Sequence, residues 1–358
     1  MEIWNTVWPI LVAIVIFGLI VFIHEFGHFL FAKIFKIRVN EFAIGFGPAI
    51  FKKKKGETLY AIRILPFGGY CAMEGENGES DDERAFYKAK PIKRIIVVAA
   101  GAVFNIILGF ILMVSLVSIS GAVQEKNLIA TTSIAAFEDN ATTNKNNGLK
   151  VKDEIYKIDG RRIFSVEEIS YMLGTAKSNK IDITVIRNGE KKELKNVEFL
   201  SKKADGKTYL TIDFKFLGAK ANFANCVKEG FYRTVSYSRI VFMSLGDLIS
   251  GKFGLNDVSG PVGVTQVVSQ AVTSTAKNGL VDGFLPLLRI LGLITINLGV
   301  FNLLPIPALD GSRILFIIVE WIRKKPVKNE AAVHAIGMAL LLAFMVLLVF
   351  KDLWAWIF

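Results

Sequence analysis

The feature that most limits how this chain can fold is an apolar stretch that carries a histidine pair. Residues 7–31 contain no ionisable side chain outside the pentapeptide His24-Glu25-Phe26-Gly27-His28. On a helix, two histidines four residues apart project from one face and can share a metal ion, with Glu25 beside them to accept a proton from water. Ionisable groups in a lipid-spanning helix are costly and usually functional. The position of the cluster in an apolar stretch is therefore more informative than the pattern itself.

Four apolar stretches are long enough to cross a bilayer, whose hydrocarbon core of about 30 Å requires about 20 helical residues. They cover residues 8–31, 95–119, 284–321 and 335–358, in a chain of 358 residues of which 52% are hydrophobic. This composition predicts a multi-pass α-helical membrane protein with four transmembrane helices.

Basic residues indicate how the chain is oriented in the membrane. The net charge is +11, and much of it clusters beside the apolar stretches, at residues 52–55, 88–94 and 323–328. The positive-inside rule places these loops in the cytosol, and both termini and the long middle region outside. The positive charge therefore does not call for nucleic acid, and we expect the lipid bilayer, not nucleic acid, as the partner.

The first loop contains two extended runs that predict a β-hairpin. Residues 39–51 and 58–65 are apolar or strand-like, and a Lys-Lys-Gly-Glu sequence joins them. We expect so apolar a hairpin to enter the membrane interface from the cytosolic side, where irregular backbone is tolerated if protein covers it. A small cytosolic β-subdomain fits the pattern about equally well.

The region after the second apolar stretch changes character. Residues 122–218 are polar and lysine-rich, and their order of a glycine turn, DEIYKIDG, a helix-like run and ITVIRNGE resembles a PDZ domain. PDZ domains bind extended peptides by adding a strand beside their own edge. Lys152 stands where a glycine is usual before the aspartate, so an intact peptide groove is not predicted, and a purely steric role stays open.

Three further patterns concern helix packing and turns. The amphipathic run at 231–249 suits a helix lying in the membrane interface. The sequence Ser-Gly-Pro-Val-Gly at 259–263 predicts a tight turn. In the second apolar stretch, Asn105 follows the small residues 99–102, and we favour close helix packing over direct chemistry as its role.

Two histidines do not complete a catalytic zinc site, which usually has three protein ligands and a water. The remaining histidine, His334, lies at the basic end of the last stretch, where an interfacial position is expected. Asp310 is a better third ligand, because Pro305 and Pro307 break the helix just before it and let the backbone turn a carboxylate inward. Counted along the helices, His24 and Asp310 lie at a similar depth in the cytosolic half of the bilayer. The alternative is that Asp310 caps the helix that resumes after the prolines.

These features divide the chain into seven segments. They are transmembrane helix 1 (1–35), a cytosolic loop with the membrane-associated β-hairpin (36–94), transmembrane helix 2 (95–121), an inserted extracytoplasmic α+β PDZ-like domain (122–218), an interfacial region (219–283), transmembrane segment 3 (284–322), and a cytosolic loop with transmembrane helix 4 (323–358). Cys71 and Cys226 fall on opposite sides of the membrane and are predicted to be unpaired.

Motifs along nearly the whole chain resemble the site-2 protease family of intramembrane zinc metalloproteases, in its bacterial RseP/RasP-like branch. They are HEFGH, AGAVFN at 100–105, the PDZ-like insert, SGPVGV at 259–264 and NLLPIPALDG at 302–311. The sequence departs from the family in having one PDZ-like unit where some relatives carry two, and Ala102 where proline is usual.

The resemblance implies roles for five residues. His24, His28 and Asp310 would hold Zn²⁺, Glu25 would be the general base, and Asn302 would position substrate or stabilise the oxyanion. The substrates would be membrane-spanning proteins of the bacterial plasma membrane, cut within their transmembrane segments. In this family such cleavage is commonly the second cut of regulated intramembrane proteolysis. The resemblance is compatible with release of an anti-sigma factor and with clearance of signal-peptide remnants.

Two other functions are weighed against this one. A non-enzymatic zinc-containing scaffold that binds peptides through its PDZ-like domain would have no need for Glu25, a non-ligating acid beside the metal. A metal transporter would need further polar residues along its ion path, and the third stretch offers mainly Asn297 and Asn302.

Overall fold

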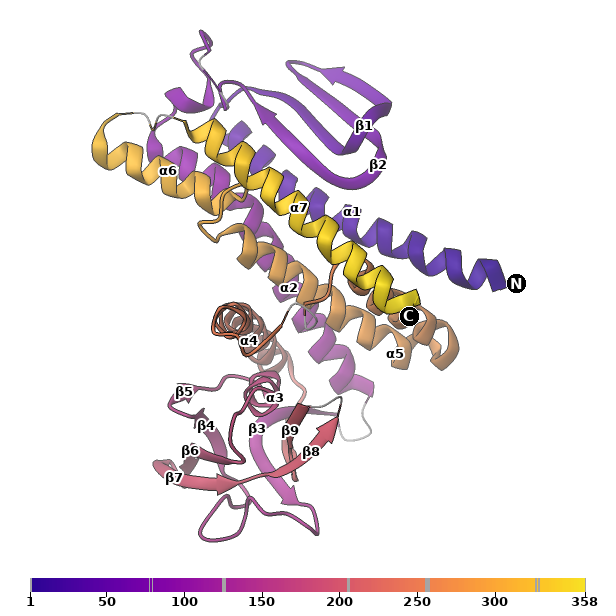
Figure 1. Cartoon of the computed structure of the whole chain (residues 1–358), viewed down its shortest axis with the longest axis vertical. Coiled ribbons are helices and arrows are strands. Elements are labelled where there is room, and N and C mark those ends of the chain that lie inside the picture. The colour runs from indigo at the N-terminus through magenta and orange to yellow at the C-terminus, as the bar shows by residue number, and fades with distance from the viewer. Residues whose placement is uncertain are drawn as a thin grey trace. The chain divides into compact units, whose positions relative to one another are not determined.

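The computed structural model describes residues 2–76, 78, 80–123, 127–204, 207–254, 258–325, 327 and 329–357. They form two compact units, and Figure 1 labels the elements of both. The first unit comprises Met1–Gly109 and Phe253–Phe358, and the second comprises Phe110–Lys252. The second unit is thus wider than the predicted domain 122–218, since it includes the end of the second apolar helix and the helix that follows the sheet.

Four helices in the described part of the chain are long and apolar enough to cross a membrane. The candidate spans are Leu11–Ile34, Pro91–Val123, Phe284–Asn302 and Glu330–Trp354. They belong to helices α1 (Glu2–Ile34), α2 (Pro91–Val123), α5 (Pro261–Asn302) and α7 (Glu330–Ile357). The prediction of four apolar helices compatible with a multi-pass membrane protein is therefore confirmed.

The third predicted stretch, 284–321, is two helices joined by a loop. Helix α5 ends at Asn302, and α6 (Asp310–Arg323) begins after the prolines, so the predicted break is confirmed. Ala308 in this loop has a φ of 82°, a left-handed conformation that costs a residue with a β-carbon about 1–2 kcal/mol. The chain therefore turns sharply two residues before Asp310.

The prediction of a tight turn at 259–263 is wrong. Gly260 is the N-cap of α5 and Pro261 is its first residue. Proline is favoured at this position because the first N–H groups of a helix have no intrahelical partner. The predicted region 219–283 accordingly holds helix α4 (Phe223–Ile249) and the first half of α5.

Glycines allow the helices of the first unit to approach closely. A β-carbon added to Gly27 of α1 would lie 2.6 Å from the carbonyl oxygen of Ala100 on α2. One added to Gly299 of α5 would lie 2.8 Å from the carbonyl oxygen of Ala102. Such approaches accept no side chain, so α1, α2 and α5 meet with their backbones in contact near the histidine pair.

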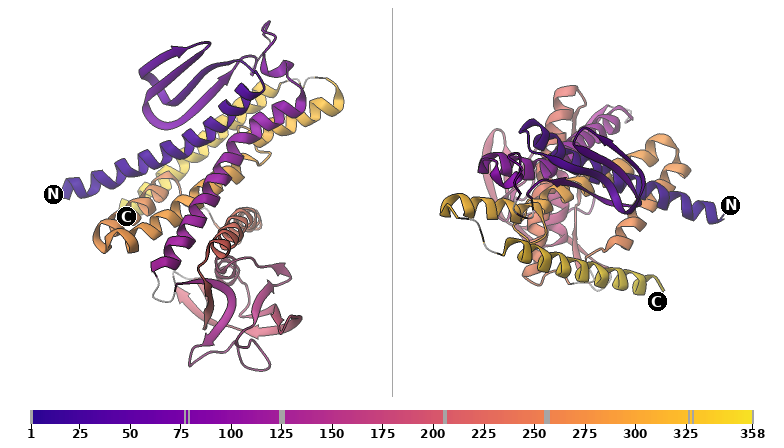
Figure 2. Two further views of the ribbon diagram at one scale, coloured as in Figure 1. Left: turned by 180° about the vertical axis from the view of Figure 1, so that it is seen from behind. Right: turned by 90° about the horizontal axis from the view of Figure 1, so that it is seen from above.

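The predicted hairpin is present and forms a curled sheet. Strands β1 (Val39–Lys55) and β2 (Thr58–Met73) pair antiparallel. Both bend, so residues 41–44 have partners at 59–62 on one side and at 69–72 on the other. The sheet lies along α1 in Figure 1 and in both views of Figure 2. Phe42 and Cys71 pack with Ala32 of α1 in one buried cluster.

The second unit is an α+β unit that combines antiparallel strands with helices. Its strands are β3 (Leu128–Phe137), β4 (Glu154–Ile158), β5 (Arg161–Arg162), β6 (Lys180–Arg187), β7 (Glu190–Glu198), β8 (Leu200–Ala204), β9 (Lys207–Thr211) and β10 (Phe214–Lys220). The main sheet has the order β10-β3-β4-β6-β7, with β5 beside β4, and β8 pairs with β9. Ile155, Ile183 and Phe214 of this sheet pack with Ile169 of helix α3 (Val166–Gly174) in the core.

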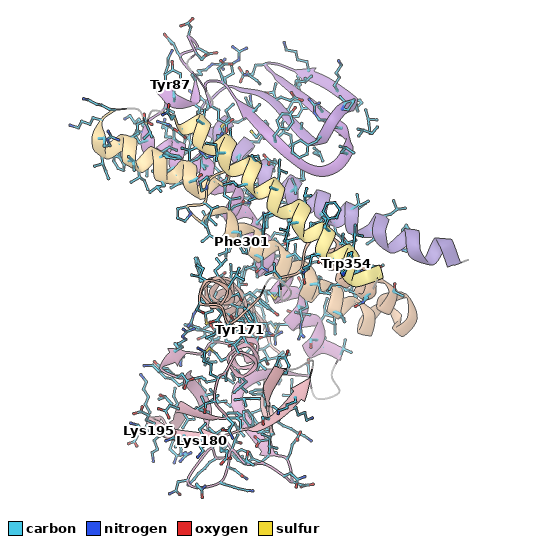
Figure 3. The ribbon with its side chains drawn as sticks, in the orientation of Figure 1. Tyr87, Tyr171, Lys180, Lys195, Phe301 and Trp354 are labelled. Atoms are coloured by element: carbon cyan, nitrogen blue, oxygen red, sulfur yellow. The ribbon has the colours of Figure 1, made fainter. Side chains whose placement is uncertain are left out.

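Helix α4 packs on α3 through polar contacts. Three of them join the helices, namely Arg233–Glu167 at 3.2 Å, Arg239–Glu168 at 3.3 Å and the hydrogen bond from the Tyr171 hydroxyl to Asp247 at 2.9 Å. Tyr171 is labelled in Figure 3. Both cysteines are free, as predicted.

Candidate metal centre

The histidine pair lies on one face of α1. His24 and His28 are one helical turn apart, each 8% exposed, with their Nε2 atoms 3.2 Å from one another. The spacing of four residues in a regular apolar helix brings the two rings together without any irregularity of the backbone. Their Nε2 atoms face the same point.

Asp310 reaches that point from another part of the chain. Its Oδ2 lies 3.2 Å from His24 Nε2 and 3.3 Å from His28 Nε2. Leu309, not Asp310, is the N-cap of α6, and the N-cap position makes no side-chain capping hydrogen bond. The loop with the two prolines therefore directs the carboxylate toward the histidines, and the capping alternative does not describe this residue.

The three donors fit a zinc ion. Their separations of 3.2, 3.2 and 3.3 Å form a nearly equilateral triangle. Donors held about 2.0–2.1 Å from a tetrahedral Zn²⁺ lie about 3.3–3.4 Å apart. Asp310 Oδ2 is buried and accepts no hydrogen bond from the described residues. Two imidazoles and one carboxylate also match a catalytic zinc set, which keeps a fourth position open.

Each histidine makes a second contact through its other ring nitrogen. His28 Nδ1 lies 2.9 Å from the carbonyl oxygen of Val97 and can donate to it. His24 Nδ1 lies 3.3 Å from the side-chain amide of Asn105, which is fully buried. Both contacts come from α2 and leave the two Nε2 atoms facing Asp310.

Two residues of α2 lie closer to the histidines than the sequence indicated. Asn105 was assigned to helix packing, but it contacts the His24 ring. A β-carbon added to Gly101 would lie 2.4 Å from His28 Nε2 and 2.9 Å from His24 Cε1. The sequence signal that could have found Asn105 is a polar residue inside an apolar helix, which is functional more often than not.

Glu25 and Asn302 border the cluster. The Nδ2 atom of Asn302, the last residue of α5, lies 3.4 Å from His24 Nε2, and its neighbour Phe301 is labelled in Figure 3. Glu25 is partly buried, and a β-carbon added to Gly69 of β2 would lie 3.2 Å from its Cγ. The curled sheet therefore reaches the acid beside the histidine pair.

His334 lies outside the group of three donors. Its Nδ1 is 3.4 Å from the backbone nitrogen of Ala308, from which it accepts a hydrogen bond. It therefore supports the left-handed turn that precedes Asp310. Helix α6 is fixed further by an ion pair between Arg313 and Glu76 of the segment after β2.

Comparison with known proteins gives a consistent set of matches. The sequence model of peptidase family M50 matches residues 12–345. A candidate zinc metalloprotease of Clostridium acetobutylicum is 37% identical over 346 residues, which cover 96% of each chain. The regulator of sigma-W protease RasP of Bacillus subtilis is 29% identical over 423 aligned positions, covering 95% of this chain and 97% of the other. The zinc metalloprotease RasP of Geobacillus kaustophilus is 29% identical and covers 98% of both chains.

Proposed function

We propose that this chain, which belongs to peptidase family M50 and is a zinc metalloprotease, hydrolyses peptide bonds within the membrane-spanning segments of other proteins. The observation that carries the proposal is the location of the histidine pair in the candidate span Leu11–Ile34. Ionisable groups in such a helix are costly, so a protease that cuts soluble proteins would have no reason to hold its site there.

The proposed zinc ligands are His24, His28 and Asp310. Support comes from the triangle of donor atoms and from the buried Asp310 oxygen that lacks a hydrogen-bond donor among the described residues. Bound Zn²⁺ lowers the pKa of a water ligand toward about 7 and polarises a carbonyl oxygen.

Glu25 is the proposed general base. It follows His24 directly, so it lies beside the donors without facing the same point as the two rings. In this role its carboxylate takes a proton from the attacking water and delivers it to the leaving amine. Asn302 would position the scissile peptide or stabilise the oxyanion through its Nδ2, which lies 3.4 Å from His24 Nε2.

The curled sheet is proposed to enter the membrane from the cytosolic side. At one end, Lys33 of α1 forms an ion pair with Glu57 at 2.8 Å. At the other end, a β-carbon on Gly69 would lie 3.4 Å from Val21 Cγ1. Val21 and Lys33 are twelve residues apart, or about 18 Å along the helix. The sheet therefore follows α1 from its basic end to the depth of Glu25.

The polarity of the sheet supports this placement. The exposed residues Phe46, Ile50 and Ile64 lie toward the end near Glu25, whereas the lysines at 52–55 lie at the end with Lys33 and Glu57. Apolar side chains are stabilised in lipid and lysines at the anionic cytosolic surface. The active site then lies toward the cytosol.

A substrate strand could pair with the sheet beside the active site. A substrate helix must be unwound before hydrolysis, because its carbonyl groups are already hydrogen-bonded. Within the described residues, the segment 69–73 of β2 pairs on one side only, with residues 39–44. An unwound segment that adds to this edge would have its backbone groups satisfied beside Glu25.

The second unit is proposed to lie outside the cytosol and to act on substrate access. Its region 122–218 carries the PDZ-like pattern, which would sense a trimmed end or exclude large outer domains. On α4, Phe231, Phe242 and Ile249 are 55%, 55% and 88% exposed. Phe242 and Ile249 follow Phe231 by 11 and 18 residues, so all three share one face of the helix, which suits the membrane interface. The protease would then make the second cut of regulated intramembrane proteolysis.

A Glu25→Gln variant tests the enzymatic role directly. We expect the purified variant to bind zinc as the wild type does and to lose cleavage of a membrane-tethered reporter by about 10²–10⁴-fold, the usual contribution of a general base. Zinc retention with undiminished cleavage would contradict the protease mechanism. A wild-type protein that binds zinc and peptides but cleaves no membrane protein would instead support the scaffold.

A further inference from the structure

The buried amide of Asn105 faces the outer nitrogen of a proposed zinc ligand. His24 directs Nε2 toward Asp310 Oδ2 at 3.2 Å, and its Nδ1 lies 3.3 Å from the Asn105 amide. Asn105 is fully buried in α2, and its Oδ1 has no hydrogen-bond partner among the described residues. A buried amide oxygen without a donor is unfavourable, because it has lost its hydrogen bonds to water and gains none from the protein.

The protonation pattern of the imidazole decides which amide atom suits the metal-bound state. A neutral histidine carries one ring proton, and a nitrogen that binds a metal must offer its lone pair. If Nε2 of His24 binds zinc, the proton is on Nδ1, and Nδ1 donates. The acceptor must then be an oxygen, and Oδ1 of Asn105 reaches this place when the amide makes a half-turn, because its oxygen and nitrogen exchange positions.

We propose that Asn105 is a positioning residue for the zinc site, whose Oδ1 accepts the Nδ1–H hydrogen bond of His24. This inference rests on the proposed function, since it takes His24 as a zinc ligand. It gives His24 the same kind of support that the carbonyl of Val97 gives His28 at 2.9 Å. Such outer contacts fix the tautomer and the ring orientation of metal-bound histidines.

The two histidines then differ in the kind of group that accepts their Nδ1–H hydrogen bond. The acceptor for His28 is a backbone carbonyl of α2, which no substitution of a side chain removes. The acceptor for His24 is a side chain, so its contribution can be measured. A role in helix packing and a role as hydrogen-bond acceptor predict opposite results for two substitutions of nearly the same size.

The test measures zinc dissociation constants by competition with a chelator, in detergent, for wild type, Asn105→Leu and Asn105→Asp. Leucine fills the space but accepts no hydrogen bond, and we expect it to weaken zinc binding about 10–100-fold. Aspartate accepts the Nδ1–H bond, and we expect its zinc affinity to remain within about threefold of wild type or to increase. Cobalt-substituted protein should show a shifted visible spectrum for the leucine variant only.

Thr295→Val is the matched control. Thr295 is fully buried in α5, and its hydroxyl has no partner among the described residues. Removing this buried hydroxyl should leave the zinc affinity unchanged. A packing role for Asn105 predicts the reverse order, in which leucine is tolerated and the buried charge of aspartate is not.

Any result in which Asn105→Leu binds zinc as well as Asn105→Asp, or in which neither variant folds, overturns the proposal. Wild-type protein that binds no zinc would instead defeat the proposed function itself. If the wild-type protein binds zinc and the two variants bind it with equal affinity, only the role of Asn105 is refuted.

Discussion

The glycine at position 101 provides a test of the proposed centre in which no ligand is substituted. In Gly101→Ala, the new β-carbon would lie 2.4 Å from His28 Nε2, 2.7 Å from His28 Cε1 and 2.9 Å from His24 Cε1. Non-bonded carbon and nitrogen atoms rest at about 3.4–4 Å, so α2 and the histidine rings must move apart by about 1 Å. Separation of the two helices is not cheap, because it would break the close backbone contact of α1 with α2 at Gly27.

A shift of this size is large for a metal site. Zinc ligands keep their distances within about 0.2 Å, so a displacement of about 1 Å in one ring removes a ligand or distorts the triangle. We expect zinc affinity to fall by more than about 100-fold, the upper end of what loss of a supporting contact costs. Proteolytic activity should fall in parallel. The assay is chelator competition on purified protein, with reporter cleavage measured at the same buffered zinc concentrations.

Gly109→Ala is the matched control on the same helix. Its new β-carbon would also lie 2.4 Å from a neighbouring atom, but that atom is Cγ1 of Ile296, a side chain that can change rotamer. This overpacking should lower the free energy of unfolding by about 1–3 kcal/mol and leave zinc affinity unchanged. If Gly101→Ala bound zinc and cleaved substrate as well as Gly109→Ala, the position assigned to the metal would be refuted.

Three further outcomes are expected. Ile62→Pro should abolish cleavage but leave zinc content unchanged. Ile62 pairs with Ile44 on one side and Phe51 on the other, and proline removes a backbone donor from the middle of the sheet. Undiminished cleavage would show that the sheet does not bind the substrate. Hydrogen bonds from Lys33 and Arg84 lower the pKa of Glu57 in the folded protein from 4.5. The charged carboxylate therefore stabilises the fold at a pH above its pKa in the unfolded chain, and this stabilisation is lost as the pH falls through its pKa in the folded protein. Glu57→Gln should therefore lower the melting temperature at neutral pH but not in acid, and a constant difference across pH would contradict the ion pairs. Removal of zinc by a chelator should abolish cleavage, and added Zn²⁺ should restore it; chelator-resistant cleavage would point to a different chemistry.

The sequence predicted much of the fold because its strongest signals are local. The apolar stretches, the hairpin around Gly56, and the helix break at Pro305 and Pro307 depend on neighbouring residues, and the structure contains all three. The error at 259–263 has a local cause as well. Ser-Gly-Pro suits both a turn and the first residues of a helix, and only the helical continuation to Asn302 distinguishes them.

The site was predictable in part. His24 and His28 are four residues apart, so their proximity follows from helix geometry, and Asp310 stands out as an acid after two prolines. Gly101 and Asn105 were missed as neighbours of the histidines because their position depends on how α1 crosses α2. A run of small residues indicates that helices approach closely, but it does not specify which side chain of the partner helix lies opposite each of them.

The proposed activity is hydrolysis of peptide bonds inside the membrane, at a site where His24, His28 and Asp310 would hold zinc. Its most direct test is to reconstitute the zinc-loaded protein in lipid vesicles with a single-span reporter and to determine the masses of both products. We expect a cut within the apolar segment of the reporter, toward its cytosolic half, and none with the Glu25→Gln variant. A cut confined to the reporter's water-exposed flanks, or one that persists in the variant, would contradict it.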